Sequence, residues 1–241
     1  MRFMEYLLET NKGGSVAGKL EIVKTSLEKA RRYAEKRMDS YKRDLDEQIP
    51  DFDDNYKLAQ AKASEGHTKR KDMPVILPKD IEDIRNRLRN GYLDISYPYS
   101  PTTSDKDPFP QNLKGKEAEQ FLQAGKEKFD GDKDDDKIKV HSERAMVSTL
   151  TPIQEQIYFD KSIEAMAKGG VEASKKWLTD KNQSIIVSLD GYVIDGHHRY
   201  LSAMLEDPSM KVHTLVIDLP IATLLPLMTA YGDARGNKRN A

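Results

Sequence analysis

The sequence predicts an α+β protein whose main domain carries a long N-terminal helical extension. Residues 184–205 give the strongest signal: an apolar run is interrupted by two Asp-Gly pairs and is then followed by helix-forming residues. This pattern is typical of a strand, a hairpin turn, a second strand, a tight turn and a helix. Residues 211–218 predict another strand, with a helix beginning at Pro220. Residues 17–48 repeat apolar side chains at steps of three, four or seven, which predicts one long helix.

Composition limits the functional classes. The 241 residues suffice for one domain with an extension, and charged residues make up 33% of them, so we expect a polar protein. The absence of cysteine excludes disulfides, thiolate metal sites and thiol catalysis, and it fits a cytoplasmic protein. The net charge of −1 does not by itself favour nucleic acid as a partner. No apolar run approaches the ~20 residues that span a bilayer, so we expect neither a secretory signal nor a membrane partner.

The first nine residues form a short amphipathic segment. One interpretation is a terminal helix docked on its own domain. The segment also resembles the head-targeting peptides of T-even-type phages, which a head protease removes after a Leu/Ile-x-Glu site. Leu7-Leu8-Glu9 would be that site. The resemblance implies a targeting peptide within 1–15 and an internal head protein, located in the host cytoplasm or in the virion interior.

Residues 16–67 are expected to form the helical extension and a linker. The 17–48 helix has a narrow apolar face, and its other positions are mostly Lys, Arg, Glu and Asp. Alternating charge signs favour a solvated face over a phosphate-binding one. We therefore expect this helix to pack on the domain, on a protein partner or on a second copy of the chain, rather than on nucleic acid. A short helix is predicted near 56–63.

The main domain is expected to span 68–228. A strand entry is predicted at 73–77 and a helix at 80–90, closed by Gly91 as a C-cap. A second strand is predicted at 145–150.

A helix should start directly after that strand. Thr151 is its expected N-cap, with Pro152 at its first position. The helical region around 157–166 should close at Gly169-Gly170.

Two segments are expected to lie outside the regular structure. Residues 96–140 are rich in Pro, Ser, Asp and Lys, which predicts a disorder-prone surface insertion with a short helix near 116–126. The acidic run 130–136 has imperfect spacing for a calcium loop, so a solvated loop is the better interpretation. Residues 229–241 are expected to form a flexible tail.

The turn at 195–199, Asp-Gly-His-His-Arg, is the candidate functional site. It places two imidazoles and a guanidinium at a predicted helix N-terminus, where unpaired backbone N–H groups and the helix dipole favour anions. Gly196 allows a close backbone approach, and Arg199 can engage phosphate oxygens in bidentate fashion. His197 and His198 can donate hydrogen bonds or act as acid and base near neutral pH. The sequence therefore predicts a phosphate-binding turn.

The order of these motifs resembles the ParB/sulfiredoxin fold, which implies a mixed-sheet domain. The resemblance covers roughly 142–228, through Leu150-x-Pro152-x-Gln154, the run 184–187, the turn that begins at Asp195 and the strand 212–218. In this family the Gly-x-x-Arg turn holds nucleotide phosphates. Sulfiredoxins carry Gly-Cys-His-Arg there and ParB partition proteins carry Gly-Glu-Arg-Arg. Free-serine kinases of the fold carry Asp-Gly-His-His-Arg, the form closest to this chain.

The resemblance also implies roles for individual residues. Gly196, His198 and Arg199 match the phosphate-binding positions, and Gln154 is a further candidate for contacting nucleotide. The reactive cysteine of sulfiredoxin matches His197, so a chain without cysteine cannot be a sulfiredoxin reductase.

Catalytic candidates follow from the same resemblance. Asp195 would hold Mg²⁺ with the phosphates or accept a proton from an attacking hydroxyl. Glu155 is the candidate for a second carboxylate. His197 and His198 complete the catalytic set.

Two classes of function remain open. One is an enzyme that binds ATP or a related nucleotide with Mg²⁺ and transfers phosphoryl groups, either as a ParB-like nuclease acting on nucleic acid or as a kinase acting on a hydroxyl. The His-His form of the turn favours the kinase. The other is a binding module, in which nucleotide acts as a switch without catalysis.

Overall fold

The computed structural model describes residues 19–93, 113–123 and 137–238. The expected targeting peptide, the acidic run 130–136 and most of the predicted insertion lie outside these residues. Within them, no helix is both long enough and apolar enough to cross a membrane.

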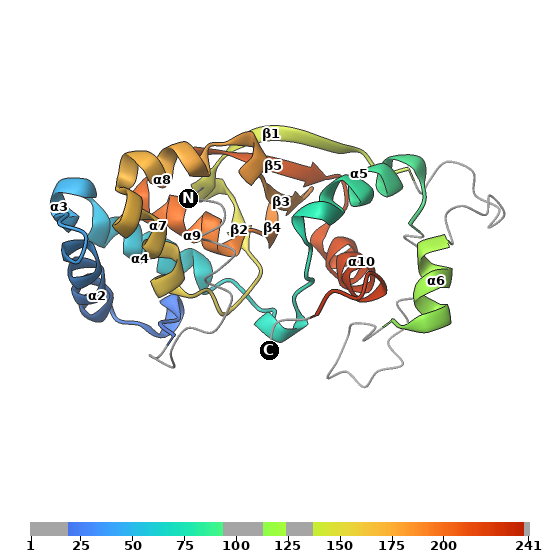
Figure 1. Ribbon diagram of the computed structural model, residues 1–241, viewed down its shortest axis with the longest axis horizontal. Coiled ribbons are helices and arrows are strands. Elements are labelled where there is room, and N and C mark those ends of the chain that lie inside the picture. Colours follow the sequence, from blue (N-terminus) through green and yellow to red (C-terminus); the bar gives the residue numbers. More distant parts are fainter. Residues whose placement is uncertain (1–18, 94–112, 124–136, 239–241) are drawn as a thin grey trace.

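A five-stranded mixed sheet forms the centre of the molecule (Figure 1). The strand order is β1-β5-β3-β4-β2, with β1–β5 and β3–β4 antiparallel and with β5–β3 and β4–β2 parallel. The strands are β1 (Val140–Met146), β2 (Thr151–Pro152), β3 (Ile185–Ser188), β4 (Tyr192–Asp195) and β5 (Lys211–Ile217). Mixed pairing with interspersed helices confirms the predicted α+β class.

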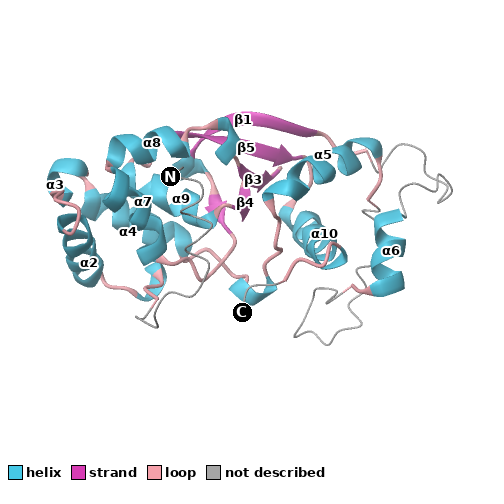
Figure 2. Cartoon of the chain, viewed as in Figure 1, coloured by secondary structure: helices cyan, strands magenta, loops and turns pink. Residues whose placement is uncertain are grey.

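Helices cover both faces of this sheet, and Figure 2 shows the three layers. On one side lie α2 (Leu27–Asp39), α3 (Leu45–Gln48), α4 (Phe52–Ala63), α7 (Phe159–Gly169), α8 (Val171–Leu178) and α9 (His197–Glu206). On the other side lie α5 (Ile81–Asn90), α6 (Gly115–Gln123) and α10 (Ile221–Ala234). Alternate strand residues face opposite layers: Ile185 packs with the first core and Ile186 with the second.

The predicted single helix over 17–48 is wrong, because the chain breaks it twice. A 3₁₀ turn, η1 (Ile22–Lys24), is followed by extended backbone before Ser26 caps α2 by accepting from the Lys29 N–H. After α2, Lys42 adopts a left-handed φ of 58° and Asp44 caps α3. Apolar spacing alone does not reveal these local caps, and for this reason the spacing predicted one helix where the structure has two.

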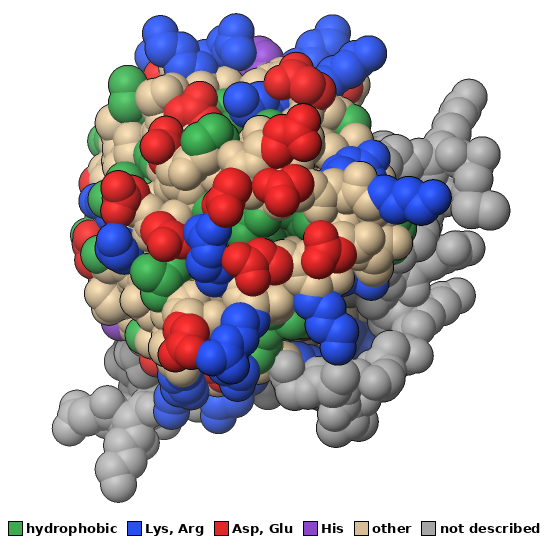
Figure 3. All heavy atoms as spheres, turned by 90° about the vertical axis from the view of Figure 1, so that its left-hand side faces the viewer, with side chains coloured by type: hydrophobic (Ala, Val, Ile, Leu, Met, Phe, Trp, Pro, Cys, Tyr) green, Lys and Arg blue, Asp and Glu red, His purple; other side chains and the backbone are tan. Residues whose placement is uncertain are grey.

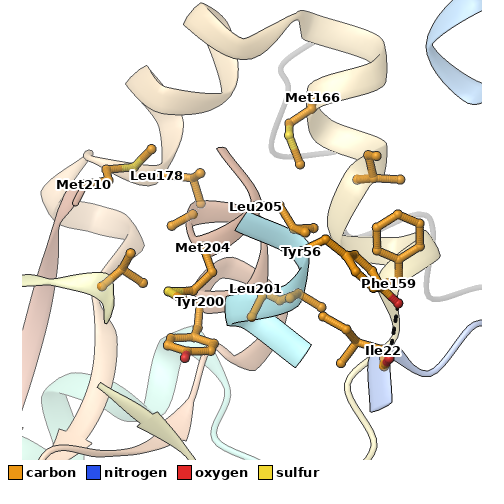
Figure 4. Packing of buried hydrophobic residues seen from close by; sticks show 14 of the residues in the cluster. Ile22, Tyr56, Phe159, Met166, Leu178, Tyr200, Leu201, Met204, Leu205 and Met210 are labelled. Carbon is orange, nitrogen blue, oxygen red and sulfur yellow. Dashed lines mark hydrogen bonds between the residues drawn. The ribbon is translucent and has the colours of Figure 1, made fainter. Parts of the chain in front are cut away.

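The predicted extension is part of the main core rather than an appendage. Tyr56 of α4 and Phe159 of α7 pack edge to face at 5.5 Å, and Figure 4 shows them beside Ile22 and Leu205. Tyr56 is fully buried. The outer surface of α2 and α3 remains polar: Figure 3 shows acidic and basic side chains intermixed on this side of the molecule, as the charge pattern predicted. Self-association through this surface stays a prediction.

Two segments of the main domain differ from the sequence prediction. Residues 73–77 are irregular rather than a strand, although Met73 and Ile76 are buried. Thr151 is not an N-cap: it pairs with Tyr192 in β2, and α7 begins only at Phe159. The Thr-Pro pair therefore lies at the edge of the sheet, where the missing N–H of proline does not break a hydrogen bond between strands. The helix closed by Gly91 is confirmed, with a left-handed φ of 68° at Gly91.

The C-terminal boundary also differs. The helix predicted to begin at Pro220 extends to Ala234, so the flexible tail expected from 229 onward is wrong for 229–234. Tyr231 is fully buried, and its hydroxyl donates a hydrogen bond to the Asp83 carboxylate at 2.6 Å. The helix near 116–126 exists as α6, and Phe121 is fully buried in it, so this part of the predicted insertion belongs to the second core.

Candidate functional site

The β4–α9 turn forms as the two Asp-Gly pairs predicted. Gly191 turns the β3–β4 hairpin with φ 83°, and Gly196 begins α9 with φ 96° and no capping side chain. Both angles lie in the left-handed region that favours glycine. The first N–H groups of α9 therefore point out of an uncapped helix N-terminus.

Arg199 folds back over this turn. Its Nη2 lies 2.9 Å from Asp195 Oδ2, four residues earlier. A Cβ on Gly196 would meet the same Nη2 at 3.0 Å and Nε at 3.1 Å. The missing side chain at 196 thus provides the space for the guanidinium. Both charged side chains remain partly exposed, 22% for Arg199 and 35% for Asp195, so they are accessible to a ligand.

His197 is buried and ties the turn to the neighbouring segment. The Gln154 backbone N–H donates to its Nε2 at 3.2 Å, and the ring also forms a hydrogen bond with the Val193 backbone. Burial lowers the pKa of His197 to about 3, so the ring is neutral and its two nitrogens are one donor and one acceptor. His197 thus links the start of α9 to the Gln154 backbone, and its predicted catalytic role stays a prediction.

His198 faces a different environment. Its ring stacks on Tyr158, with centroids 6.2 Å apart and planes at 25°. Its Nε2 is buried and has no hydrogen-bond partner among the described residues. Burial and then the charges of Lys161 and Arg70 lower the pKa of His198 to about 3. His198 is therefore a neutral imidazole whose buried Nε2 makes no hydrogen bond within the described residues.

Three cationic side chains lie over the same Tyr158 ring. Lys19 Nζ, Arg70 Cζ and Lys161 Nζ are 5.2, 5.0 and 5.7 Å from its centroid. Desolvation, then the charges of Arg70 and Lys19, lower the pKa of Lys161. The three cations are thus close enough to repel one another.

Short backbone pairings hold these cations in place. Glu21 pairs with Tyr158 in an antiparallel bridge, which brings Lys19 beside the ring. Thr68 pairs with Gln154 in a parallel bridge, and the Glu155 N–H donates to the Thr68 carbonyl at 3.0 Å. The residues predicted to form a linker therefore form one wall of the site.

Gln154 and Glu155 lie beside the site in roles other than those expected. The Gln154 side chain is buried and donates to the Gln156 carbonyl, so only its backbone reaches the turn. The Glu155 carboxylate interacts electrostatically with Lys24. The structure joins Asp195 to Arg199 through an ion pair across Gly196, and Glu155 follows the residue whose backbone N–H binds His197.

Sequence reasoning missed Tyr158 and the three cations over it. Arg70 is the middle residue of the basic run Lys69-Arg70-Lys71, and it is the one of the three that is partly buried against Tyr158. Lys19 and Lys161 carry no local signal, because surface lysines are common in this chain.

Mg²⁺ fits this site only together with phosphates. Among the described residues, no group of three or more His, Asp or Glu side chains is placed to hold a metal. Asp195 uses Oδ2 for Arg199 and keeps Oδ1 without a hydrogen bond in the described part of the chain. Mg²⁺ commonly takes one or two carboxylates plus substrate phosphates. Asp195 Oδ1 would supply the protein ligand.

Comparison with known proteins finds no similar family model, no similar curated protein and no similar solved structure. Inference about this site therefore depends on its own geometry.

Proposed function

We propose that the protein binds a nucleotide or related phosphate ester at the β4–α9 turn. The observation that carries this proposal is the uncapped N-terminus of α9, with Arg199 folded over Gly196 and the unpartnered His198 Nε2 beside it. Backbone N–H groups at a helix start and a guanidinium fork are the usual elements of a phosphate site. The ParB/sulfiredoxin resemblance is part of the same proposal, and the strand–turn–helix arrangement supports it.

Phosphoryl transfer is the catalytic form of this proposal. Mg²⁺ would supply charge neutralisation of the phosphates, and Asp195 would hold it or accept the proton of an attacking hydroxyl. Arg199 would bind the phosphate oxygens, and His198 would donate a hydrogen bond from its neutral ring. His197 would keep the turn in place. A hydroxyl acceptor makes the protein a kinase, and water on a phosphodiester makes it a ParB-like nuclease.

A non-catalytic nucleotide switch is the second candidate. It is favoured by the hydrogen bonds that commit both His197 nitrogens to the fold. A switch needs only Gly196, His198 and Arg199.

Titration calorimetry and a turnover assay test the proposal together. Purified protein is incubated with labelled ATP, Mg²⁺, nucleic acid and free serine. We expect saturable nucleotide binding that Arg199→Ala weakens at least about tenfold, since a charged hydrogen bond contributes about 1.5–3 kcal/mol. Turnover lost in Asp195→Ala identifies the enzyme, and binding without turnover identifies the switch. A wild-type protein that shows neither contradicts the proposal.

A pair of glycine variants separates the site from general strain. Gly196→Ala introduces both a left-handed alanine and a contact with Arg199, so it should weaken binding. Gly191→Ala introduces the same type of strain in the hairpin, where the nearest atom is 3.9 Å away. It should lower stability and keep affinity.

The internal-head-protein proposal has its own test. The protein isolated from virions should begin at Thr10 if the Leu7-Leu8-Glu9 site is cleaved. A virion protein beginning at Met1 contradicts processing.

A further inference from the structure

We infer that the cations over Tyr158 form a second phosphate subsite, which makes the site selective for ligands with a polyphosphate chain over monophosphates. This inference rests on the proposed function, because it assumes that a first phosphate lies at the α9 N-terminus. The stacking of His198 on Tyr158 makes the two subsites adjacent. A di- or triphosphate could therefore contact both, whereas a single phosphate could contact only one.

Three basic side chains gather at the second subsite. Lys19, Arg70 and Lys161 converge on one ring, and within the described residues Lys19 and Lys161 form no ion pair with a carboxylate. Asp160 is the acid that influences Lys161, and its Oδ1 accepts the Leu20 N–H at 3.3 Å. A bound polyanion would relieve the repulsion between these cations.

Two helix N-termini add to this field. Tyr158 is the N-cap residue of α7 and provides no side-chain cap, and α7 packs against α9, whose N-terminus forms the first subsite. The positive ends of both helix dipoles therefore lie near the stacked Tyr158–His198 pair. Dipoles and side-chain cations favour the same ligand, a compact multiply charged anion.

The buried position of Tyr158 determines which kind of polyanion fits. Its ring is 8% exposed, since cations and His198 cover it, so it offers no open face for a nucleobase. Proteins that bind single-stranded nucleic acid without sequence preference commonly use such open faces. The subsite therefore recognises the charge of a ligand rather than its nucleobase, which favours a free polyphosphate chain over a nucleic-acid strand.

Competition calorimetry with AMP, ADP, ATP, GTP and inorganic tripolyphosphate tests this inference. We expect affinity to rise by about tenfold or more from AMP to ATP, GTP to bind like ATP, and tripolyphosphate to compete with both. Lys161→Met and Lys19→Met should each reduce ATP and tripolyphosphate affinity several-fold while leaving AMP affinity unchanged. Lys57→Met is the matched control, since this exposed lysine on α4 pairs with Asp54 away from Tyr158.

The outcomes separate the two proposals. If no nucleotide binds at all, the proposed function is wrong. If AMP and ATP bind equally and Arg199→Ala abolishes both, the first subsite stands and the polyphosphate subsite is wrong. Equal effects of Lys161→Met and Lys57→Met overturn the subsite too, as does a single-stranded oligonucleotide that binds more tightly than tripolyphosphate.

Discussion

Two buried ionisable side chains at opposite ends of α9 are held in uncharged forms. Burial lowers the pKa of His197 to about 3 at the start of the helix, and burial raises the pKa of Glu206 to about 8 at its end. Glu206 is 6% exposed, and nearby Ser174 and Lys175 only partly offset its desolvation. Both groups make the stability of the fold depend on pH, with opposite signs.

The Glu206→Gln variant isolates the acidic contribution. Between the ordinary pKa of 4.5 and the folded value of about 8, the folded state binds more protons than the unfolded state. The contribution of Glu206 to stability is therefore full below pH 4.5 and is lost as pH rises through 8. We expect the variant to gain stability over wild type with rising pH, by about 2–4 kcal/mol at pH 9.

Urea unfolding across pH 4–9 measures this difference. The exposed Glu119 of α6 provides the control, since it does not act on Glu206 and Glu119→Gln should leave the wild-type pH dependence intact. Parallel curves for wild type and Glu206→Gln would show that Glu206 ionises normally in the fold.

At the scale of elements, the segment around η1 connects α4 to the site. The single proton of the Tyr56 hydroxyl is shared between the Thr25 carbonyl at 2.8 Å and the Ile22 carbonyl at 3.2 Å (Figure 4 shows the second contact). The Ile22 N–H in turn donates to the Ile157 carbonyl at 3.0 Å, directly before Tyr158. These bonds position Lys19 through elements that do not touch a ligand.

Tyr56→Phe should therefore loosen the second subsite from a distance. Loss of the hydroxyl leaves two buried carbonyls with one donor fewer, which should cost about 1–2 kcal/mol of stability and lower ATP affinity more than AMP affinity. Tyr200→Phe is the control, because its hydroxyl makes a longer contact of 3.4 Å with the Leu150 carbonyl. Urea unfolding and calorimetry measure both effects; equal losses of AMP and ATP affinity would contradict the proposed route.

At the scale of the whole molecule, the C-terminal end closes the second layer. Asn237 Nδ2 donates to the Val75 carbonyl at 2.8 Å and to Asp80 Oδ2 at 2.9 Å. Asp80 is fully buried, and its Oδ2 also accepts the Leu77 N–H at 3.1 Å. The Asn237 amide and the Asp80 carboxylate thus satisfy the Val75 carbonyl and the Leu77 N–H in a stretch that lacks strand pairing.

The Asn237→Ala variant should destabilise the protein by about 1–2 kcal/mol, because it removes two hydrogen bonds to partly or fully buried acceptors. Thermal and urea unfolding should both report the loss. Lys238→Ala, at an exposed neighbouring position, should stay within about 0.5 kcal/mol of wild type. An Asn237→Ala protein as stable as wild type would mean that the Asn237 side-chain hydrogen bonds contribute nothing measurable to stability.

Features set by short-range chemistry were predictable. The hairpin, the turn at Gly196 and α9 follow from alternation of apolar residues and from two Asp-Gly pairs, and the structure places them as expected. The helix ending at Gly91 follows equally from a local C-cap. The breaks in 17–48 and the strand role of Thr151 were missed, because they depend on which segment the backbone pairs with.

The sequence by itself determined the α+β class and the strand–turn–helix arrangement at 195–199, since glycine conformations and helix starts depend on neighbouring residues. Only the tertiary structure decided that His197 is buried and accepts the Gln154 N–H, and that the Gln154 side chain turns to the Gln156 carbonyl. It also decided the convergence of three cations on Tyr158. These features join residues far apart in the chain, and burial and Coulomb interactions act through space rather than along the sequence.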